Sequence, residues 1–85
     1  MFINKTNDGR NNICGEQVAK FRISRKLSQR QLADILQSQG LDIDKNAIQR
    51  IEAGKRFVTD IELTYFSKVL NLPYEILLDN PDSPD

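Results

Sequence analysis

Residues 27–56 read LSQRQLADILQSQGLDIDKNAIQRIEAGKR, and they contain the clearest helix start and stop signals of the chain. Ser28 is followed three residues later by Gln31, the spacing of a capping box, in which each side chain satisfies a free backbone N–H group. The apolar residues that follow on one helical stripe are Leu32, Ala33, Ile35 and Leu36. The pattern predicts a helix over about 29–39. It should stop at Gly40, because glycine readily takes the left-handed conformation that ends helices.

A second, shorter helix is predicted directly downstream. Asp44 is a good N-cap for the segment KNAIQRIEA. The residues of this segment that follow apolar helical spacing are Ala47, Ile48 and Ile51. Gly54 should end the helix in the same way as Gly40 ends the first. Two short capped helices joined by a turn that contains glycine form the arrangement called helix-turn-helix.

Further helices are expected on both sides of this pair. Upstream, GEQVAKFRISRKL has helical apolar spacing and predicts a helix over about 16–26. Downstream, Thr59 and Glu62 form a second capping box and open a helix over about 60–71. Its apolar residues are Ile61, Leu63, Phe66, Val69 and Leu70. Pro73 fits the start of a last short helix, YEILLD. We see no strand pattern and no repeat, so the chain is predicted to be all-α.

The chain divides into three parts. Residues 1–14 are rich in Asn, Gly and Thr and show no periodicity, so they are expected to be a flexible N-terminal lead-in. Residues 15–79 hold all the predicted helices. Residues 80–85, NPDSPD, are expected to form an acidic C-terminal tail. A chain of 85 residues is expected to hold one small core and no elaborate enclosed active site.

The composition excludes several classes of function. The chain has no histidine and a single cysteine, Cys14, which excludes disulfide frameworks, multi-cysteine zinc sites and histidine-based catalysis. We therefore expect no catalytic residues, no metal, no cofactor and no enzymatic activity. Cys14 itself should be a small, partly buried hydrophobe. No apolar run reaches membrane-spanning length, and MFINKTNDGRNN lacks the apolar run of a signal peptide, so a cytoplasmic location without membrane contact is expected.

Charge is unevenly distributed along a chain whose net charge is zero. Residues 16–58 contain nine basic and five acidic side chains, which gives this region a net charge of plus four. From Thr59 onward Lys68 is the only basic residue against six acidic ones, which gives minus five. Because the local field steers a charged ligand, a neutral chain of this kind can still present a positive face to a polyanion.

Three segments, LSQRQLADIL, AIQRIEAGKR and ELTYFSKVLNLPYEIL, occur in this order between Gly15 and about Leu78. Together they resemble the Cro/phage-repressor-type (XRE-like) helix-turn-helix family, whose signature is an L-S-Q…L-A segment followed by I-x-x-I/L-E-x-G-K/R. The resemblance covers some three-quarters of the chain. It implies a compact five-helix, lambda-repressor-like DNA-binding domain whose partner is double-stranded DNA.

The resemblance also implies roles for individual residues. The helix opened by Asp44 would be the recognition helix, which lies in the major groove of DNA. Its candidate base-contacting residues are Lys45, Asn46, Ala47, Gln49 and Arg50. The candidate phosphate-contacting residues are Ser28, Gln29, Arg30, Lys55 and Arg56. Arg22 and Glu52 match a structural pair that joins the first helix to the third.

Simpler interpretations of these residues remain open. Lys55 and Arg56 could be ordinary solvated side chains after a helix stop. Arg50 could pair with an acidic neighbour on its own helix. Lys45 and Gln49 could be ordinary polar surface residues.

The turn departs from the common family pattern. Eleven residues separate Leu36 from Ile48, more than most family members have there, so this is a longer-turn variant. The added segment brings Asp42 and Asp44 near the expected path of the phosphates, where like charges repel. Asp44 is explained as a cap, whereas Asp42 has no explanation from the sequence.

The function predicted from these features is a sequence-specific transcriptional regulator of bacterial or phage type, a repressor that binds its operator as a homodimer. The expected dimer contacts are apolar residues near the C-terminus: Tyr74, Ile76, Leu77 and Leu78. The alternative is a protein-interaction module, such as an antitoxin-like or anti-repressor subunit, that uses the same fold to bind a protein partner. The net charge of zero and Asp42 favour this alternative.

Overall fold

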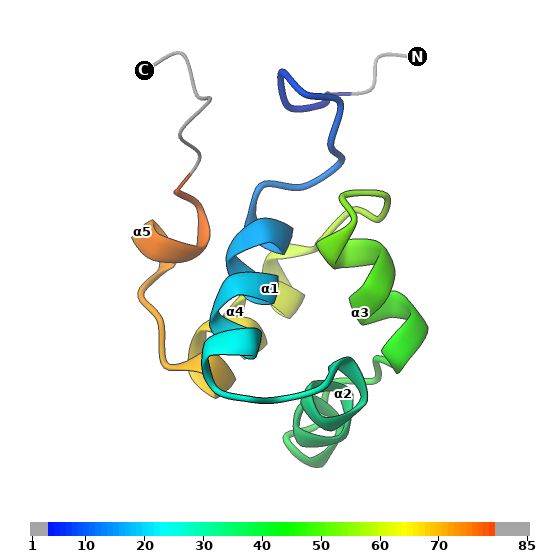
Figure 1. Cartoon of the computed structure of the whole chain (residues 1–85), viewed down its shortest axis with the longest axis vertical. Coiled ribbons are helices and arrows are strands. Elements are labelled where there is room, and N and C mark those ends of the chain that lie inside the picture. The colour runs from blue at the N-terminus through cyan, green and yellow to red at the C-terminus, as the bar shows by residue number, and fades with distance from the viewer. Residues whose placement is uncertain (1–3, 80–85) are drawn as a thin grey trace.

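The computed structural model describes residues 4–79, and in this range the chain forms five α-helices (Figure 1). They are α1 (Cys14–Ser24), α2 (Gln29–Ser38), α3 (Lys45–Glu52), α4 (Asp60–Leu70) and α5 (Tyr74–Leu77). The all-α, five-helix class predicted from the sequence is confirmed. In Figure 1, α1 and α4 lie in the middle of the view, with α5 on one side and α3 on the other.

The core lies where α1 packs against α3, α4 and α5, while α2 packs against α3 and α4. Its largest fully buried side chains are Phe66, Leu32, Leu36, Ile48, Ile51, Leu70, Leu77 and Val18. Every helix contributes at least one of them, so each element is held to the domain by burial of apolar surface. The helix-turn-helix pair α2–α3 is thus held in place by packing against α1 and α4.

The first helix begins and ends about two residues earlier than predicted. It begins at Cys14 because the Asn12 side-chain oxygen accepts a hydrogen bond from the Gly15 N–H group at 2.8 Å. It ends before Lys26, which has a positive φ of 58°. The Leu27 N–H group then donates to the Arg22 carbonyl oxygen at 3.1 Å, which completes the helix stop. Lys26 thus adopts the left-handed backbone conformation that glycine usually adopts at the end of a helix.

The second helix starts and stops as predicted. Ser28 and Gln31 form the expected capping box. At the other end Gly40 has a φ of 107°, and the N–H group of Leu41 donates to the Leu36 carbonyl oxygen at 3.0 Å. This pattern is a Schellman stop, which satisfies carbonyl groups at the end of the helix.

The long turn between α2 and α3 is anchored in the core. Leu41 is 9% exposed and Ile43 is 3% exposed, so alternate residues of the turn point inward. The Gln37 side-chain amide donates to the Ile43 carbonyl oxygen at 2.6 Å, which holds the turn to the last turn of α2. The additional residues therefore form a packed connection and do not protrude as a free loop.

The last two helices complete the core. Thr59 and Glu62 form the second predicted capping box, and α4 ends at Asn71, which takes the left-handed conformation. Ile61, although apolar, is 65% exposed and lies outside the core. It lies about 180° around α4 from the buried Leu70, since each residue turns a helix by about 100°.

The predicted dimer contact at Leu77 is wrong. Its side chain is 0% exposed and belongs to the core, so it cannot contact a second molecule. The other expected contacts, Tyr74, Ile76 and Leu78, are exposed. A helix as short as α5 has one inward side, and Leu77 occupies it.

The N-terminal segment also differs from the prediction. A flexible lead-in was expected over residues 1–14, but Asn12 is buried and its amide contacts the end of α3. The backbone N–H group of Asn11 donates to the Gly54 carbonyl oxygen at 2.7 Å. The expectation is therefore wrong for this part of the segment. Residues 1–3 and the predicted tail 80–85 lie outside the described residues.

Candidate nucleic-acid interface

The third helix begins with a side-chain cap. The Asp44 carboxylate accepts a hydrogen bond from the Ala47 N–H group at 2.8 Å, as its sequence position predicted. This bond satisfies one of the free N–H groups of the first turn. Asp44 is thereby committed to the fold of its own helix.

The inward side of α3 is apolar. Ile48 and Ile51 are both 0% exposed and pack in the core with α1 and α2. Ala47 is half-buried beside them, so its methyl group lies at the border between the core and the surface. Three residues on one side of an eight-residue helix fix its rotation about its own axis.

The outward side of α3 carries polar side chains without partners. Lys45, Asn46, Gln49 and Arg50 are exposed. At about 100° per residue, their mean direction is roughly opposite to that of Ile48 and Ile51. Among the described residues, the side chains of these four form no hydrogen bond and no ion pair with the protein. In particular, Arg50 is not paired with an acidic neighbour on its own helix.

Glu52, at the end of α3, joins three helices. It accepts hydrogen bonds from the Arg22 guanidinium at 2.7 and 3.1 Å, and a further one from the Gln29 side-chain amide at 3.0 Å. Arg22 also donates to the Leu27 carbonyl oxygen at 2.7 Å. Because both charged side chains are largely buried and bonded in two-pronged geometry, the cluster ties α1 and the start of α2 to α3.

The residues at the start of α2 divide into two groups. Ser28 is exposed, and its hydroxyl oxygen accepts from the Gln31 N–H group at 3.0 Å. Arg30 is exposed and makes no ion pair within the described residues. Gln29 is half-buried and engaged with Glu52, an interaction that the sequence did not predict. The local sequence does not indicate the Gln29–Glu52 hydrogen bond, because the two residues are 23 positions apart.

The two basic residues after α3 differ from each other. The Lys55 side chain is exposed and unpaired among residues 4–79. The Arg56 guanidinium instead donates to both carboxylate oxygens of Glu62, at 3.0 and 2.8 Å. The hydrogen bond from Arg56 is the largest cause that lowers the pKa of Glu62, and the same bond raises the pKa of Arg56. Arg56 was expected to be free for phosphate, and in this conformation it is not.

Asp42 lies on the outside of the turn that precedes α3. Asp42 is exposed and has no partner in the part of the chain that the structure describes. Its neighbours Leu41 and Ile43 are buried, so the alternation of the turn places Asp42 on the outside. Burial of its neighbours accounts for its position, although no interaction of its carboxylate does.

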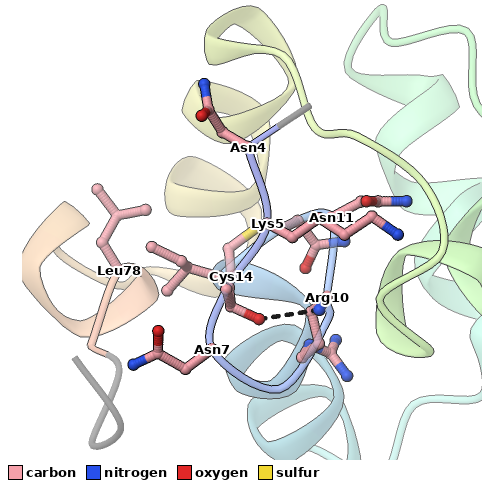
Figure 2. Close-up of a pocket in the computed structure, with 10 residues that line it drawn as sticks. Asn4, Lys5, Asn7, Arg10, Asn11, Cys14 and Leu78 are labelled. Carbon is pink, nitrogen blue, oxygen red and sulfur yellow. Dashed lines mark hydrogen bonds between the residues drawn. The ribbon is translucent and has the colours of Figure 1, made fainter. Parts of the chain in front are cut away.

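A pocket of about 440 Å³ lies between the N-terminal segment and Leu78; Figure 2 shows the residues that line it. Cys14 is among its lining residues but is only 2% exposed. Burial raises the pKa of the Cys14 thiol to about 11, so the thiol stays protonated near neutral pH and is a poor nucleophile.

In the described range no group of three or more His, Cys, Asp or Glu side chains could hold a metal ion. None of the helices there is both long and apolar enough to cross a bilayer.

Two capped helices, α2 and α3, joined by a turn and packed against each other, make this chain a helix-turn-helix protein. Residues 18–77 match the family described as helix-turn-helix. This match covers more than half of the chain, which therefore belongs to the Cro/C1-type, XRE-like helix-turn-helix family. The chain is a DNA-binding transcriptional regulator of the XRE type. No curated protein and no solved structure matches it.

Proposed function

We propose that this regulator is a repressor that binds a two-fold symmetric operator as a homodimer, with α3 in the major groove. The observation that carries the proposal is the outward side of α3, where Lys45, Asn46, Gln49 and Arg50 are exposed and have no partner among the described residues. Side chains already bonded within the protein would have to break those bonds before they could contact a base edge. These four have no such bonds to break.

Each residue type on this side suits a particular base. The Arg50 guanidinium can donate two parallel hydrogen bonds to guanine, whereas the side-chain amides of Asn46 and Gln49 pair a donor with an acceptor, as adenine requires. The Ala47 methyl group suits the thymine methyl group. Lys45, at the helix start, is assigned to guanine or to a nearby phosphate.

Phosphate contacts would hold the helix in the groove. We assign them to Ser28, Gln29 and Arg30 at the start of α2, where the free N–H groups and the dipole of the helix favour an anion. The Gln29 amide donates one N–H group to Glu52 and keeps the other for a phosphate. After α3 we assign a phosphate contact to Lys55. For Arg56 a phosphate contact would require the guanidinium to leave Glu62, so we assign it a smaller contribution.

The dimer would form through exposed apolar residues close to the C-terminus. Tyr74 is 46% exposed, Ile76 is 38% exposed and Leu78 is 46% exposed. Two α3 helices related by a two-fold axis would read half-sites about 34 Å apart, one turn of DNA. One recognition helix covers few base pairs, so two are needed for useful specificity.

Selection of bound sequences from a random DNA pool tests the proposal. We expect enriched sequences with two inverted half-sites whose centres are about ten base pairs apart. Enrichment of a single half-site would contradict the homodimer, and no enrichment would contradict sequence-specific binding.

The alternative function, a protein-interaction module, is favoured by one observation. Phe57 is 57% exposed and Ile61 is 65% exposed, which places apolar surface beside the entrance to α4. Titration with generic duplex DNA at rising salt separates the two functions. Phosphate neutralisation makes the affinity fall steeply with salt, whereas a chain that binds only protein would show no such fall.

A further inference from the structure

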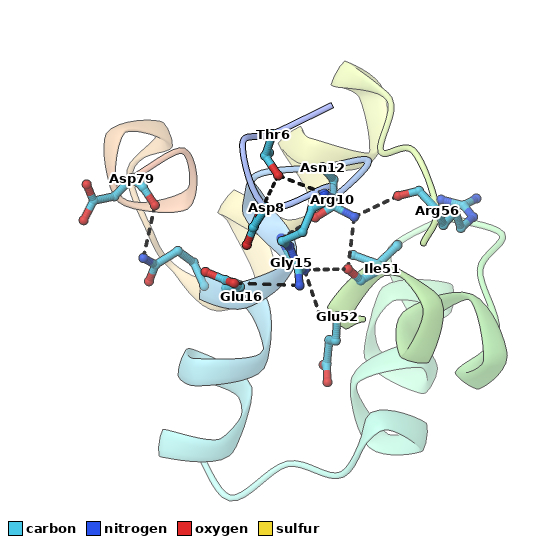
Figure 3. Close-up of polar contacts among 11 residues, drawn as sticks. Thr6, Asp8, Arg10, Asn12, Gly15, Glu16, Ile51, Glu52, Arg56 and Asp79 are labelled. Carbon is cyan, nitrogen blue, oxygen red and sulfur yellow. Dashed lines mark hydrogen bonds and ion pairs between the residues drawn. The ribbon is translucent and has the colours of Figure 1, made fainter. Parts of the chain in front are cut away.

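The C-terminal end of α3 is bonded to a segment more than forty positions earlier in the chain. The last carbonyl groups of an α-helix have no partner within the helix. In α3 the Ile51 carbonyl oxygen accepts from the Gly54 N–H group at 3.0 Å, just beyond the helix. Here the Arg10 guanidinium donates to the Glu52 carbonyl oxygen at 2.9 Å and to that of Ile51 at 3.4 Å (Figure 3). A cation is also the favourable charge at this end of the helix dipole.

Asn12 joins the end of α3 to the beginning of α1. Its side-chain N–H groups donate to the Ile51 carbonyl oxygen at 3.0 Å and to the Arg56 carbonyl oxygen at 2.8 Å. Its side-chain oxygen accepts from the Gly15 N–H group at 2.8 Å, as Figure 3 shows. Asn12 is only 8% exposed, so one buried amide group holds two helix ends together.

Two glycines allow this close approach. A Cβ atom on Gly15 would lie 2.1 Å from the Ile51 carbonyl oxygen. A Cβ atom on Gly54, the stop residue of α3, would lie 2.8 Å from the Arg10 guanidinium carbon. The Arg10 side chain therefore lies directly against the end of α3.

The segment that presents Arg10 is itself closed into a turn. The Thr6 hydroxyl oxygen accepts from the Arg10 N–H group at 2.9 Å, and the Thr6 N–H group donates to the Arg10 carbonyl oxygen at 2.9 Å. Beyond it, the Asn11 side-chain amide donates to the Lys55 carbonyl oxygen at 3.1 Å. The contacts thus form a continuous set from Thr6 to Asn12.

We propose that Arg10 and Asn12 are positioning residues for base recognition, which hold the end of α3 so that Gln49 and Arg50 meet the bases in register. This inference rests on the proposed function. Gln49 and Arg50 immediately precede the two residues whose carbonyl groups are bonded. Hydrogen bonds to bases tolerate only a few tenths of an ångström in donor–acceptor distance, so a shift of this helix end weakens base contacts more than phosphate contacts.

The test compares Arg10→Ala and Arg10→Lys with Lys5→Ala. Lys5→Ala removes an exposed positive charge from the same segment without touching α3. We expect Arg10→Ala to lower affinity for the selected operator roughly three- to thirtyfold relative to generic DNA. The salt dependence of generic binding should not change, because no phosphate contact is lost. Arg10→Lys should restore part of the ratio, since it keeps the charge but loses the planar fork.

Asn12→Asp provides a second variant of nearly the same shape. It keeps the acceptor for the Gly15 N–H group but replaces the donors to Ile51 and Arg56 with a carboxylate oxygen that faces their carbonyl groups. We expect faster amide hydrogen exchange in the last turn of α3, measured without DNA. If Asn12→Asp does not fold, exchange in Arg10→Ala provides the same measurement.

A variant in α4, Val69→Ala, controls for general loss of stability. It should lower the melting temperature and leave the ratio of operator to generic affinity unchanged. The proposal is overturned if Arg10→Ala changes neither that ratio nor the exchange of α3. It is also overturned if Arg10→Ala weakens all DNA equally with a smaller salt dependence, because Arg10 would then be a phosphate contact. A parent chain that binds no DNA would refute the proposed function, whereas the exchange measurement would still decide whether Arg10 anchors α3.

Discussion

The two sides of α3 differ in how far their polar groups are satisfied by the protein itself. On the inner side and at the C-terminal end, Glu52 is held by Arg22 and Gln29, and the terminal carbonyl groups are held by Arg10 and Asn12. On the outer side the polar side chains are free of partners among the described residues. One set of polar groups thus immobilises the helix within the domain, and a different set is left without partners at its surface.

The largest effect is expected for Gly15→Ala, which disturbs the contact between α1 and the C-terminal end of α3. The new Cβ atom would lie 2.1 Å from the Ile51 carbonyl oxygen, so α1 and α3 would have to separate. We expect the free energy of unfolding to fall by about 3 kcal/mol or more, measured by urea denaturation. Gly9→Ala is the control, because Gly9 has open space around it; its φ of 84° lies in the left-handed region, whereas that of Gly15 does not. It should cost only about 1 kcal/mol, and equal losses in the two variants would contradict a steric cause.

The exposed basic residues of α3 and of the segment after it are tested with Arg50→Ala and Lys55→Ala. If Arg50 reads a base, its loss should reduce discrimination at one operator position by about 1–3 kcal/mol. If Lys55 contacts phosphate, its loss should weaken all sequences about equally and lower the salt slope by about one. Lys68→Ala, an exposed change on α4, should alter neither property. Selection from a DNA pool and salt titration measure both, and identical profiles for Arg50→Ala and Lys55→Ala would remove the distinction between them.

Glu62→Gln tests whether Arg56 serves mainly as a partner of Glu62 within the protein or is available to DNA. The pKa of Glu62 is lowered below its ordinary value of 4.5, chiefly by the hydrogen bond from Arg56. A lowered carboxyl pKa stabilises the fold above the ordinary value, and this stability is lost as pH falls through the folded pKa. We therefore expect Glu62→Gln to cost about 1–2 kcal/mol at pH 7.

Urea denaturation from pH 7 down to pH 3 measures this effect of Glu62→Gln. The difference from the parent should shrink once the pH falls below 4.5. The variant should also release Arg56 and increase affinity for generic DNA. A cost that does not depend on pH would contradict the assigned cause.

The smallest effect is expected at the end of α1, which is not part of either side of α3. Lys26 has a φ of 58°, a conformation that costs a residue with a Cβ atom about 1 kcal/mol and that glycine adopts freely. We expect Lys26→Gly to raise the free energy of unfolding by about 0.5–1 kcal/mol and to leave operator preference unchanged. Asn71→Gly should raise it less, because asparagine tolerates this conformation better. Thermal unfolding measures both variants, and a loss of stability in Lys26→Gly would show that the lysine side chain makes a compensating contribution.

The parts of this structure that the sequence predicted correctly depend on contacts within a few residues. Ser28 with Gln31, Thr59 with Glu62, and the Asp44 cap each join groups three positions apart, so the chemistry of the pair is visible in the sequence itself. The same holds for the inward side of α3, because its apolar residues follow the period of the helix.

The features that the sequence did not reveal depend on packing between distant segments. Arg10 reaches Glu52 across 42 positions, and nothing in an Asn-rich segment without periodicity announces such a contact. Gln29 was assigned from the resemblance alone, and its bond to Glu52 depends on the packing of the start of α2 near the end of α3. Arg56 lies in a connection without helical period, where its pairing with Glu62 depends on the path of the backbone.

The length of α3 has a consequence for what the segment could do by itself. Isolated helices shorter than about 12–15 residues are marginal in water, and α3 has eight. A synthetic peptide of this sequence would be mostly unfolded and would bear the same side chains with no fixed geometry. Recognition is in this sense a property of the whole domain, because core packing and hydrogen bonds from distant segments hold the helix.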